Sequence, residues 1–217
     1  MVAGKVKHVH AETRRSTPTL LTLLGLAAIL LAAVPRGGCR AQGSREAARP
    51  YGESLWLEAE QFEKTGGWKL DTQAIDQMGS PFLLATGIGT PVDDAATEVD
   101  VPESGRYRLW VRTRDWAPRH HPGRFRVVLG GNEVEHTFGQ SGKPGWRWED
   151  SGTVHLDAGS LRVRLHDETG YYGRCDALVL TQDLDWEPPH SAEAIEPLRR
   201  ACGGISRERQ VSTHDVV

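Results

Sequence analysis

The sequence predicts an all-β domain, an antiparallel β-sandwich or jelly roll, and two observations support this. Apolar and charged residues alternate with a period of two in residues 105–116 (GRYRLWVRTRDW), 124–129 (RFRVVL) and 161–166 (LRVRLH). That period is the spacing of side chains on one face of a strand, whereas an amphipathic helix repeats every 3.6 residues. Gly, Asp, Ser and Pro separate these stretches at short distances, as they do between the strands of antiparallel sandwiches.

The longest of these stretches sorts its side chains onto two faces of a strand. One face is predicted to pack in a core and carries Tyr107, Leu109, Val111 and Thr113. The opposite face is predicted to stay solvated, with its arginines paired to acidic side chains on neighbouring strands. It carries Arg106, Arg108, Trp110, Arg112 and Arg114.

Nine strands are expected in all, which suits two packed sheets. Their ranges are 55–60, 82–86, 96–101, 106–114, 124–129, 133–138, 152–156, 161–166 and 176–181. Turn chemistry supports the boundaries, because residues 130–132 (GGN) tolerate positive φ and residues 102–105 (PESG) close another hairpin. Since the connections are hairpins, we expect helices to contribute little inside the domain.

The sandwich is expected to span residues 53–189, because Pro188 and Pro189 end the strand pattern. Residues 191–201 (SAEAIEPLRRA) then predict a short helix, with an N-cap serine, acidic residues early and basic residues late. Pro197 inside this segment disfavours the helix. A charged linker follows, and the last residues (THDVV) turn apolar.

The N-terminus is typical of an export signal. Residues 20–34 (LLTLLGLAAILLAAV) are uncharged and mostly apolar, and they follow a basic segment. Fifteen residues fit the core of a signal peptide better than a membrane span, which needs about 20. We therefore assign residues 1–41 to a signal peptide cut after Ala41 and residues 42–52 to a flexible spacer. The expectation is a periplasmic or secreted protein without a stable membrane span after cleavage.

Two other export routes stay open. Cys39 follows two glycines, as at the end of a bacterial lipobox that would make a lipoprotein, although Arg36 stands where that pattern has an aliphatic residue. The pair at residues 14–15 (RR) is compatible with a twin-arginine signal, although residues 17–18 (TP) replace the usual apolar pair.

Charge and cysteine content indicate which classes of partner and which disulfides are possible. Removal of residues 1–41 leaves 20 basic and 28 acidic residues, a net charge of −8. Such a domain is not expected to bind the phosphate backbone of a nucleic acid. Only Cys175 and Cys202 remain, which permits a single disulfide in an oxidising compartment but excludes a disulfide framework. Burial of Cys175 as a free thiol is the alternative.

The sequence contains no local signature of nucleophilic or zinc catalysis. Gly-x-Ser-x-Gly, His-Glu-x-x-His, Walker and Cys-x-x-Cys patterns do not occur in it. The pair His120-His121 has no third metal ligand nearby and is interpreted as part of a solvated loop. A glycan-active enzyme would use Asp115, Asp150 or Asp167, but carboxylates at turns are more often caps or partners of arginine. We therefore expect a noncatalytic chain.

Aromatic residues gather in segments that are expected to be loops. Flat rings stack on the apolar faces of sugars, and flanking charged groups hydrogen-bond sugar hydroxyls. The alternative is that some of these rings pack beneath the loops as a small core. The predicted ligand-binding residues are Trp116, Trp146, Trp148, Tyr171, Tyr172 and Arg114.

Long blocks of the sequence resemble a known family. They are LEAE at 57–60, GGW at 66–68, the strand at 105–116, WRWEDSGTVHLDAG at 146–159 and LHDETGYYGRCDALVLTQD at 165–183. Together they look like the carbohydrate-binding-like sandwich domain of bacterial xanthan-lyase and golvesin-type proteins. The resemblance covers residues 53–189 and implies a galactose-binding-like fold with a polysaccharide or glycan as partner.

A more distant resemblance implies a structural metal. The Glu-Ala-Glu of the first strand and the Asp-Ala-Leu-Val-Leu of the last are similar to family 6 and 35 carbohydrate-binding modules, where acidic residues at these places ligate calcium. Glu58, Glu60 and Asp176 are the candidates by that resemblance. Three residues fall short of the six to eight oxygen ligands that calcium takes. Pairing of the carboxylates with arginines is the alternative.

A closely similar domain is attached to FAD-dependent oxidoreductases of environmental bacteria. Residues 214–217 (HDVV) resemble the first strand of an FAD-binding Rossmann domain, so residues 190–217 would hold a helix, a linker and the truncated start of that domain. The chain would then be the N-terminal, glycan-binding part of an exported flavoenzyme, unable to bind FAD alone. Two alternatives are a sandwich that only packs on the flavin domain and a glycan-active enzyme.

Overall fold

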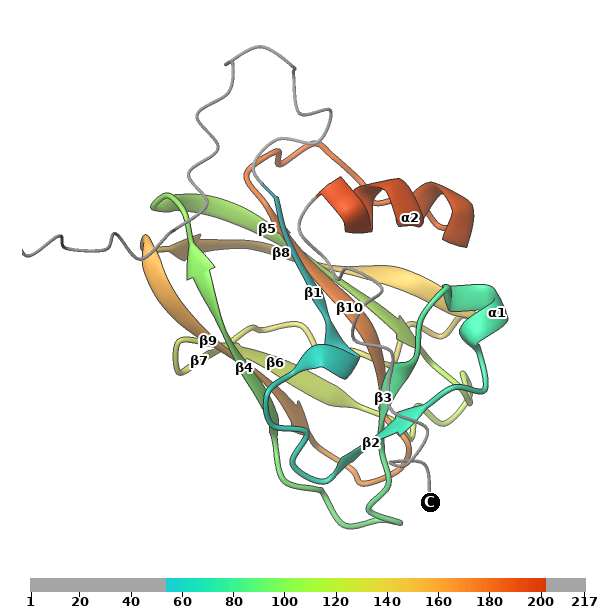
Figure 1. The fold of residues 1–217 in the computed structure, drawn as a ribbon. Helices are drawn as coiled ribbons and strands as arrows, with labels where there is room; N and C mark the ends of the chain where they lie inside the picture. Colours follow the sequence, from blue (N-terminus) through green and yellow to red (C-terminus); the bar gives the residue numbers. More distant parts are fainter. Residues whose placement is uncertain (1–53, 202–217) are drawn as a thin grey trace, which may run out of the picture. The chain divides into compact units, whose positions relative to one another are not determined.

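The alternating stretches form two antiparallel sheets, which a computed structural model describes over residues 54–201 (Figure 1). Sheet A has the order β2-β3-β10-β5-β8, with β1 also paired to β10, and sheet B has the order β4-β9-β6-β7. The strands are β1 (Ser54–Glu58), β2 (Trp68–Asp71), β3 (Phe82–Ala85), β4 (Ala95–Val101), β5 (Gly105–Arg114), β6 (Phe125–Leu129), β7 (Asn132–Glu133), β8 (Trp146–Leu156), β9 (Gly159–Asp167) and β10 (Arg174–Thr181). The helices are η1 (Ala59–Gln61), α1 (Ile75–Met78) and α2 (Ala192–Ala201).

Several predictions fall outside the described residues. These are the signal peptide at 1–41 with its alternatives, the spacer at 42–52, the linker and the apolar end at 213–217. Cys202 also lies outside them, so its pairing with Cys175 stays a prediction. Cys175 itself is fully buried in β10 between β5 and β3, and it forms no disulfide with another residue of the described range. No helix within residues 54–201 is long and apolar enough to cross a membrane.

The core lies between the two sheets and confirms the predicted inward face of β5. Tyr107, Leu109, Val111 and Thr113 are all fully buried. They pack against the inward residues of sheet B, among them the fully buried Leu165 of β9. The antiparallel β-sandwich predicted from the sequence is therefore the fold of the molecule.

The prediction that the opposite face of β5 stays solvated is wrong for its central residues, whereas Arg106 is exposed and Arg108 pairs with Asp150 of the neighbouring β8, as expected. Trp110 and Arg112 are 7% and 3% exposed, because α2 lies across this outer face of sheet A (Figure 1). The helix begins at its predicted N-cap, where Ser191 Oγ accepts a hydrogen bond from the Ala194 N–H at 3.3 Å. Ile195 and Leu198 of α2 are buried against tryptophans of the sheet. The helix is thus a cover for one face of the sandwich.

Several strand boundaries also differ from the predictions, and the first strand ends at Glu58, where residues 59–61 form η1. The strand expected at 152–156 begins at Trp146, because residues 146–150 continue the pairing with β5. The register shifts between Arg108 and Trp110, and Gly152 takes a φ of 80°, so Gly152 lies in a β-bulge and does not begin the strand. The strand expected at 133–138 is reduced to the short β7. Strand β2 and helix α1 were not anticipated.

Candidate functional site

Two loops at one end of sheet A bring together three of the aromatic residues predicted to bind a ligand. Trp116 follows β5, and Tyr171 and Tyr172 lie in the loop between β9 and β10. The Trp116 Nε1 atom donates a hydrogen bond to the Tyr171 carbonyl oxygen at 3.1 Å, and the Trp116 and Tyr172 rings meet edge to face at 5.9 Å. Trp116 and Tyr171 remain 37% and 46% exposed. We call these three residues the aromatic platform.

Two arginines place positive charge beside the aromatic platform. The Arg174 guanidinium lies 5.4 Å from the centre of the Trp116 ring and donates a hydrogen bond to the Tyr172 carbonyl oxygen at 2.7 Å. Burial, together with the neighbouring charge of Arg114, lowers the pKa of Arg174 to about 10. Within residues 54–201 the Arg114 Nε atom is buried without a hydrogen-bond partner. Two guanidiniums held this close favour a ligand rich in hydrogen-bond acceptors.

Backbone strain is concentrated in the loops around the aromatic platform. In the described part of the chain, three residues other than glycine have a positive φ: Ile88 at 50°, His121 at 46° and Tyr172 at 60°. For a β-branched residue such as Ile88 this conformation is a marked outlier. Ile88 is also 75% exposed, so burial of its side chain does not offset the strain. Strain of this kind is found mainly at binding and catalytic sites.

Contacts between the loops hold the strained residues in place. The Gly89 N–H donates a hydrogen bond to the Gly170 carbonyl oxygen at 3.3 Å. A Cβ atom on Gly89 would lie 2.6 Å from the Tyr171 hydroxyl oxygen, so only glycine lets the tyrosine ring lie there. On the other side, Asp115 Oδ2 lies 2.6 Å from His121 Nδ1 and accepts a hydrogen bond from the Gly142 N–H at 3.0 Å. The platform is therefore preorganised.

The other two tryptophans of the predicted set lie elsewhere, on a strand and not in a loop. Trp146, at the start of β8, packs its ring 4.8 Å from the ring of Phe82. Trp148 is 6% exposed, meets the Trp56 ring at 5.5 Å and donates a hydrogen bond from Nε1 to the Pro189 carbonyl oxygen at 2.9 Å. The residues between 146 and 150 pair with β5, and this pairing turns both indoles onto the covered outer face of sheet A. The predicted ligand set thus divides into two groups.

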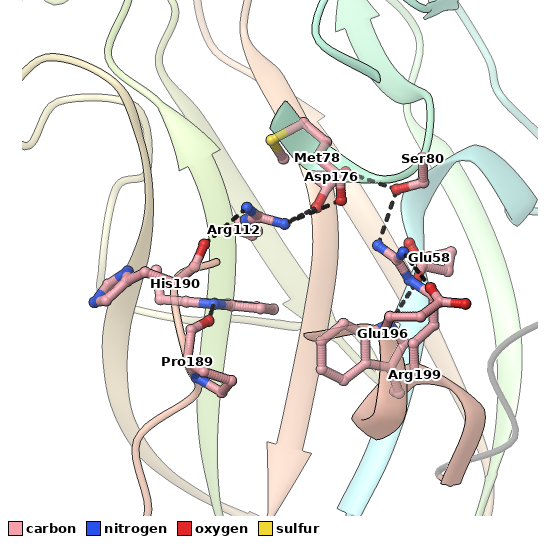
Figure 2. A network of polar contacts seen from close by, with 11 residues as sticks. Glu58, Met78, Ser80, Arg112, Asp176, Pro189, His190, Glu196 and Arg199 are labelled. Carbon is pink, nitrogen blue, oxygen red and sulfur yellow. Dashed lines mark hydrogen bonds and ion pairs between the residues drawn. The ribbon is translucent and has the colours of Figure 1, made fainter. Parts of the chain in front are cut away.

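Two of the carboxylates predicted to bind calcium, Glu58 and Asp176, lie on the outer face of sheet A, where arginines meet them (Figure 2), and the third, Glu60, lies in η1. Glu58 Oε1 accepts hydrogen bonds from Trp56 Nε1 at 2.6 Å and from Arg199 Nε. Asp176 accepts hydrogen bonds from Arg112 at 3.4 Å and from Ser80 Oγ at 3.2 Å. The Glu58 and Asp176 carboxylates are therefore each paired with an arginine.

These residues do not fit the calcium prediction. Among the described residues, no group of three His, Cys, Asp or Glu side chains is arranged to hold a metal ion. Two guanidiniums stand where a cation would bind, and calcium takes six to eight oxygen ligands. The oxygens left over are Glu58 Oε2 and Glu60 Oε2, which are buried without a hydrogen-bond partner in residues 54–201. Glu58 and Asp176 follow the alternative of arginine pairing, whereas Glu60 makes no ion pair within residues 54–201.

The three carboxylates considered for catalysis each hold local structure. Asp115 binds His121 and the Gly142 N–H, as described above. Asp150 accepts hydrogen bonds from the Arg108 guanidinium at 2.5 and 3.2 Å. Asp167 accepts them from the backbone N–H groups of residues 92, 169 and 170. These contacts are those of turn caps and arginine partners.

The two packed antiparallel sheets place the molecule in the class of β-sandwich domains. Within that class, residues 57–182 match the model of the Golvesin C-terminal domain, which is more than half of the chain. The chain therefore belongs to the Golvesin C-terminal domain family, and the resemblance of the sandwich to golvesin-type proteins is confirmed.

Solved structures with a similar fold include carbohydrate-binding modules. A family 35 module from Clostridium thermocellum is 21% identical, with a TM-score of 0.47, over 58% of this chain and 97% of the module. A β-(1,4)-mannanase with a family 35 module, from Podospora anserina, is 23% identical, with a TM-score of 0.48, over 63% of this chain. The C-terminal family 6 module of LamC from Zobellia galactanivorans is 18% identical, with a TM-score of 0.45, over 59% of this chain and 99% of the module.

The match covers only 29% of the Podospora anserina mannanase, so the similarity does not extend to most of that enzyme. A comparison with curated proteins gave no match.

Proposed function

We propose that this domain is a noncatalytic module that binds a glycan through the aromatic platform. The observation that carries the proposal is the coincidence of exposed aromatic rings with strained loops. Trp116 and Tyr171 are exposed at one end of sheet A, and positive φ angles at Ile88, His121 and Tyr172 flank them. Strained backbone conformations cluster at binding sites, and a rigid, preformed surface binds its ligand at a lower entropic cost.

The chemistry of the platform suits a sugar ring. The apolar face of a pyranose stacks on an indole or phenol ring, while its hydroxyl oxygens accept hydrogen bonds from guanidiniums. Arg174 lies over the Trp116 ring, and Arg114 is its neighbour, so donors and a stacking surface occur together. Bound to a polysaccharide, the module would raise the local concentration of an attached enzyme at its substrate.

Affinity electrophoresis tests this function. The native chain and the variants Trp116→Ala and Tyr171→Ala are run through gels that contain a panel of neutral and acidic polysaccharides. The native chain should be retarded by at least one polysaccharide, and each variant should lose about tenfold in affinity, or about 1.4 kcal/mol. His155→Ala is the matched control, because His155 has an exposed ring and lies on β8 opposite Arg106, at the other end of β5. Retention of Trp116→Ala equal to that of the native chain would contradict the proposal.

The alternative occupant of the platform is an attached flavin domain, against which the sandwich would pack without binding sugar. In that case no polysaccharide retards the native chain, but the separately produced flavin domain binds it in trans. Binding in trans that survives Trp116→Ala would place the contact elsewhere on the sandwich.

The parent protein is proposed to be an exported FAD-dependent oxidoreductase, on the resemblance of the sandwich and of residues 214–217 to such proteins. The nucleotide sequence of the locus past codon 217 tests this, because a Gly-x-Gly-x-x-Gly turn should follow in one of the three frames. Export is tested by N-terminal sequencing of the mature protein. A start at Gln42 is expected for periplasmic or secreted protein, and a lipid-modified Cys39 for the lipoprotein alternative.

A further inference from the structure

Arg199 of α2 reaches into the carboxylate cluster on the outer face of sheet A. Its Nε atom donates a hydrogen bond to Glu58, and its Nη2 atom donates to Ser80 Oγ at 3.0 Å (Figure 2). Ser80 Oγ in turn donates to Asp176 at 3.2 Å. Arg199 is only 6% exposed. Its guanidinium thus links Glu58 directly, and Asp176 through Ser80, although these acidic side chains are far apart in the sequence.

Arg199 supplies one of the two guanidiniums that pair with the acidic side chains of this cluster. Glu58 and Asp176 are paired with Arg199 and Arg112. Glu60 has no ion pair within the described range, and burial, followed by the charges of Glu58 and Asp176, raises its pKa to about 10. Without Arg199, a single arginine would face three buried carboxyl groups. Breaking a buried pair in this way is strongly destabilising, because one charge is left uncompensated.

The apolar face of α2 fixes the position of Arg199. Ile195, Leu198 and Arg199 share one face of the helix by their spacing of three and four residues. The first two pack on Trp56, Trp110 and Trp148, and the Arg199 guanidinium lies 6.0 Å from the centre of the Trp56 ring. Arg200 points away, with a 65% exposed side chain that pairs with Glu196 at 2.8 Å. The two neighbouring arginines therefore differ in burial and not in type.

We propose that the Arg199 guanidinium is the resident cation of a site formed by Glu58, Glu60 and Asp176. Helix α2 is then an intramolecular ligand of the sheet, and the folded unit runs to residue 201, past residue 182 where the family match ends. Removal of Arg199 leaves Glu58 without its cation partner, and within residues 54–201 no group of three acidic or histidine side chains is arranged to take a metal ion in its place. The inference does not depend on glycan binding, because the aromatic platform contributes nothing to this cluster.

The test compares Arg199→Ala with Arg200→Ala in the full chain. Thermal unfolding is followed with excess calcium and with EDTA, and Tb³⁺ luminescence excited through tryptophan reports a lanthanide at the cluster, since Trp56 contacts Glu58. We expect identical midpoints of the native chain in calcium and EDTA, and no Tb³⁺ signal. Arg199→Ala should unfold about 10 °C lower than the native chain in both solutions, give no Tb³⁺ signal and regain part of the loss in millimolar guanidinium. Arg200→Ala should behave as the native chain.

Three results would overturn the proposal. Stabilisation of the native chain by calcium would mean that Arg199 leaves room for a metal. Equal midpoints of Arg199→Ala and Arg200→Ala would mean that the guanidinium does not hold the helix, and recovery of Arg199→Ala in calcium would mean that the carboxylates form a metal site by themselves. If Arg199→Ala does not fold, refolding in millimolar guanidinium decides, because this cation should restore the fold and its failure contradicts the proposal. Arg199→Lys should fold with intermediate stability and no Tb³⁺ signal.

Discussion

The outer face of sheet A and its open end both carry tryptophans, yet the two groups have opposite surroundings. Trp56, Trp110 and Trp148 are 6–8% exposed beneath α2. Trp116 is six residues from Trp110, beyond the end of the same strand, and is 37% exposed beside Tyr172. The covered rings have apolar neighbours and a buried ion-pair cluster, whereas the open ring has arginines and strained loops. The role of a tryptophan here follows from what covers it.

The largest expected effect is on the stability of the covered group. Trp148→Ala should lower the free energy of unfolding by about 3–5 kcal/mol, because it removes a large buried side chain and leaves a cavity. Trp116→Ala should lower it by less than about 1 kcal/mol, because a half-exposed ring at a loop buries less area. Urea unfolding of both variants measures the difference. Equal losses of unfolding free energy in the two variants would contradict the distinction between the covered and the open tryptophans.

The covered side should also govern the dependence of stability on pH. The pKa of Glu60 rises from 4.5 to about 10, because of burial and then the charges of Glu58 and Asp176. Between these values the folded protein keeps a proton that the unfolded chain has lost, so stability falls as pH rises through this window. Glu60→Gln, which stays neutral, should reduce the slope by about 1 kcal/mol per pH unit.

Urea unfolding at a series of pH values measures that slope. Part of it should persist in Glu60→Gln, because burial and the Glu58 carboxylate raise the pKa of Asp176 to about 8 against the opposing effect of Arg112 and Arg199. Identical slopes for the native chain and Glu60→Gln would show that Glu60 is ionised in the folded protein.

The smallest effect on stability is expected at the open end. Ile88→Gly removes a left-handed β-branched residue, a gain of about 1–2 kcal/mol, and adds unfolded-state entropy, a loss of about 0.5–1 kcal/mol. The net change in the free energy of unfolding should therefore be within about 1 kcal/mol and on the stabilising side. Retention in polysaccharide gels should nevertheless decrease, because the loop that supports Tyr171 becomes more flexible. A large loss of stability would show that the strain of Ile88 supports the fold and not the site.

The sequence was sufficient for the sandwich and for the helix, and insufficient for the surface that the helix covers. Period-two alternation identified the inward face of β5, since each strand residue reports its own side. The solvated outer face was a wrong expectation because cover comes from residues 192–201, some 80 residues further along the chain. The spacing of Ile195 and Leu198 indicated an apolar helix face. Such a pattern does not indicate which strand the helix packs against. Gly152 was wrongly predicted to begin a strand, because glycine occurs both in β-bulges and in the turns that bound strands.

The candidate site was only partly accessible from the sequence. Trp116, Tyr171 and Tyr172 were grouped as aromatic loop residues, and the fold brings them together. Trp146 and Trp148 were grouped with them because the strand was expected to begin later, and the alternation of WRW was the neglected signal. Arg174 and Ile88 were missed, since the position of a guanidinium over a ring and a positive φ both depend on how distant loops meet. The glycines on either side of Ile88 were the available hint.

In the reduced chain, the buried thiol of Cys175 has a consequence for kinetics. Burial, followed by the charge of Asp176, raises the pKa of this thiol well above its ordinary value, and alkylating reagents react with exposed thiolate. Modification therefore requires β10 to separate from β5 and β3, which disrupts the centre of sheet A. At high reagent concentration the rate of labelling at Cys175 equals the rate at which the sheet opens. Labelling of Cys175 in the native chain therefore measures the rate of that opening without an engineered probe.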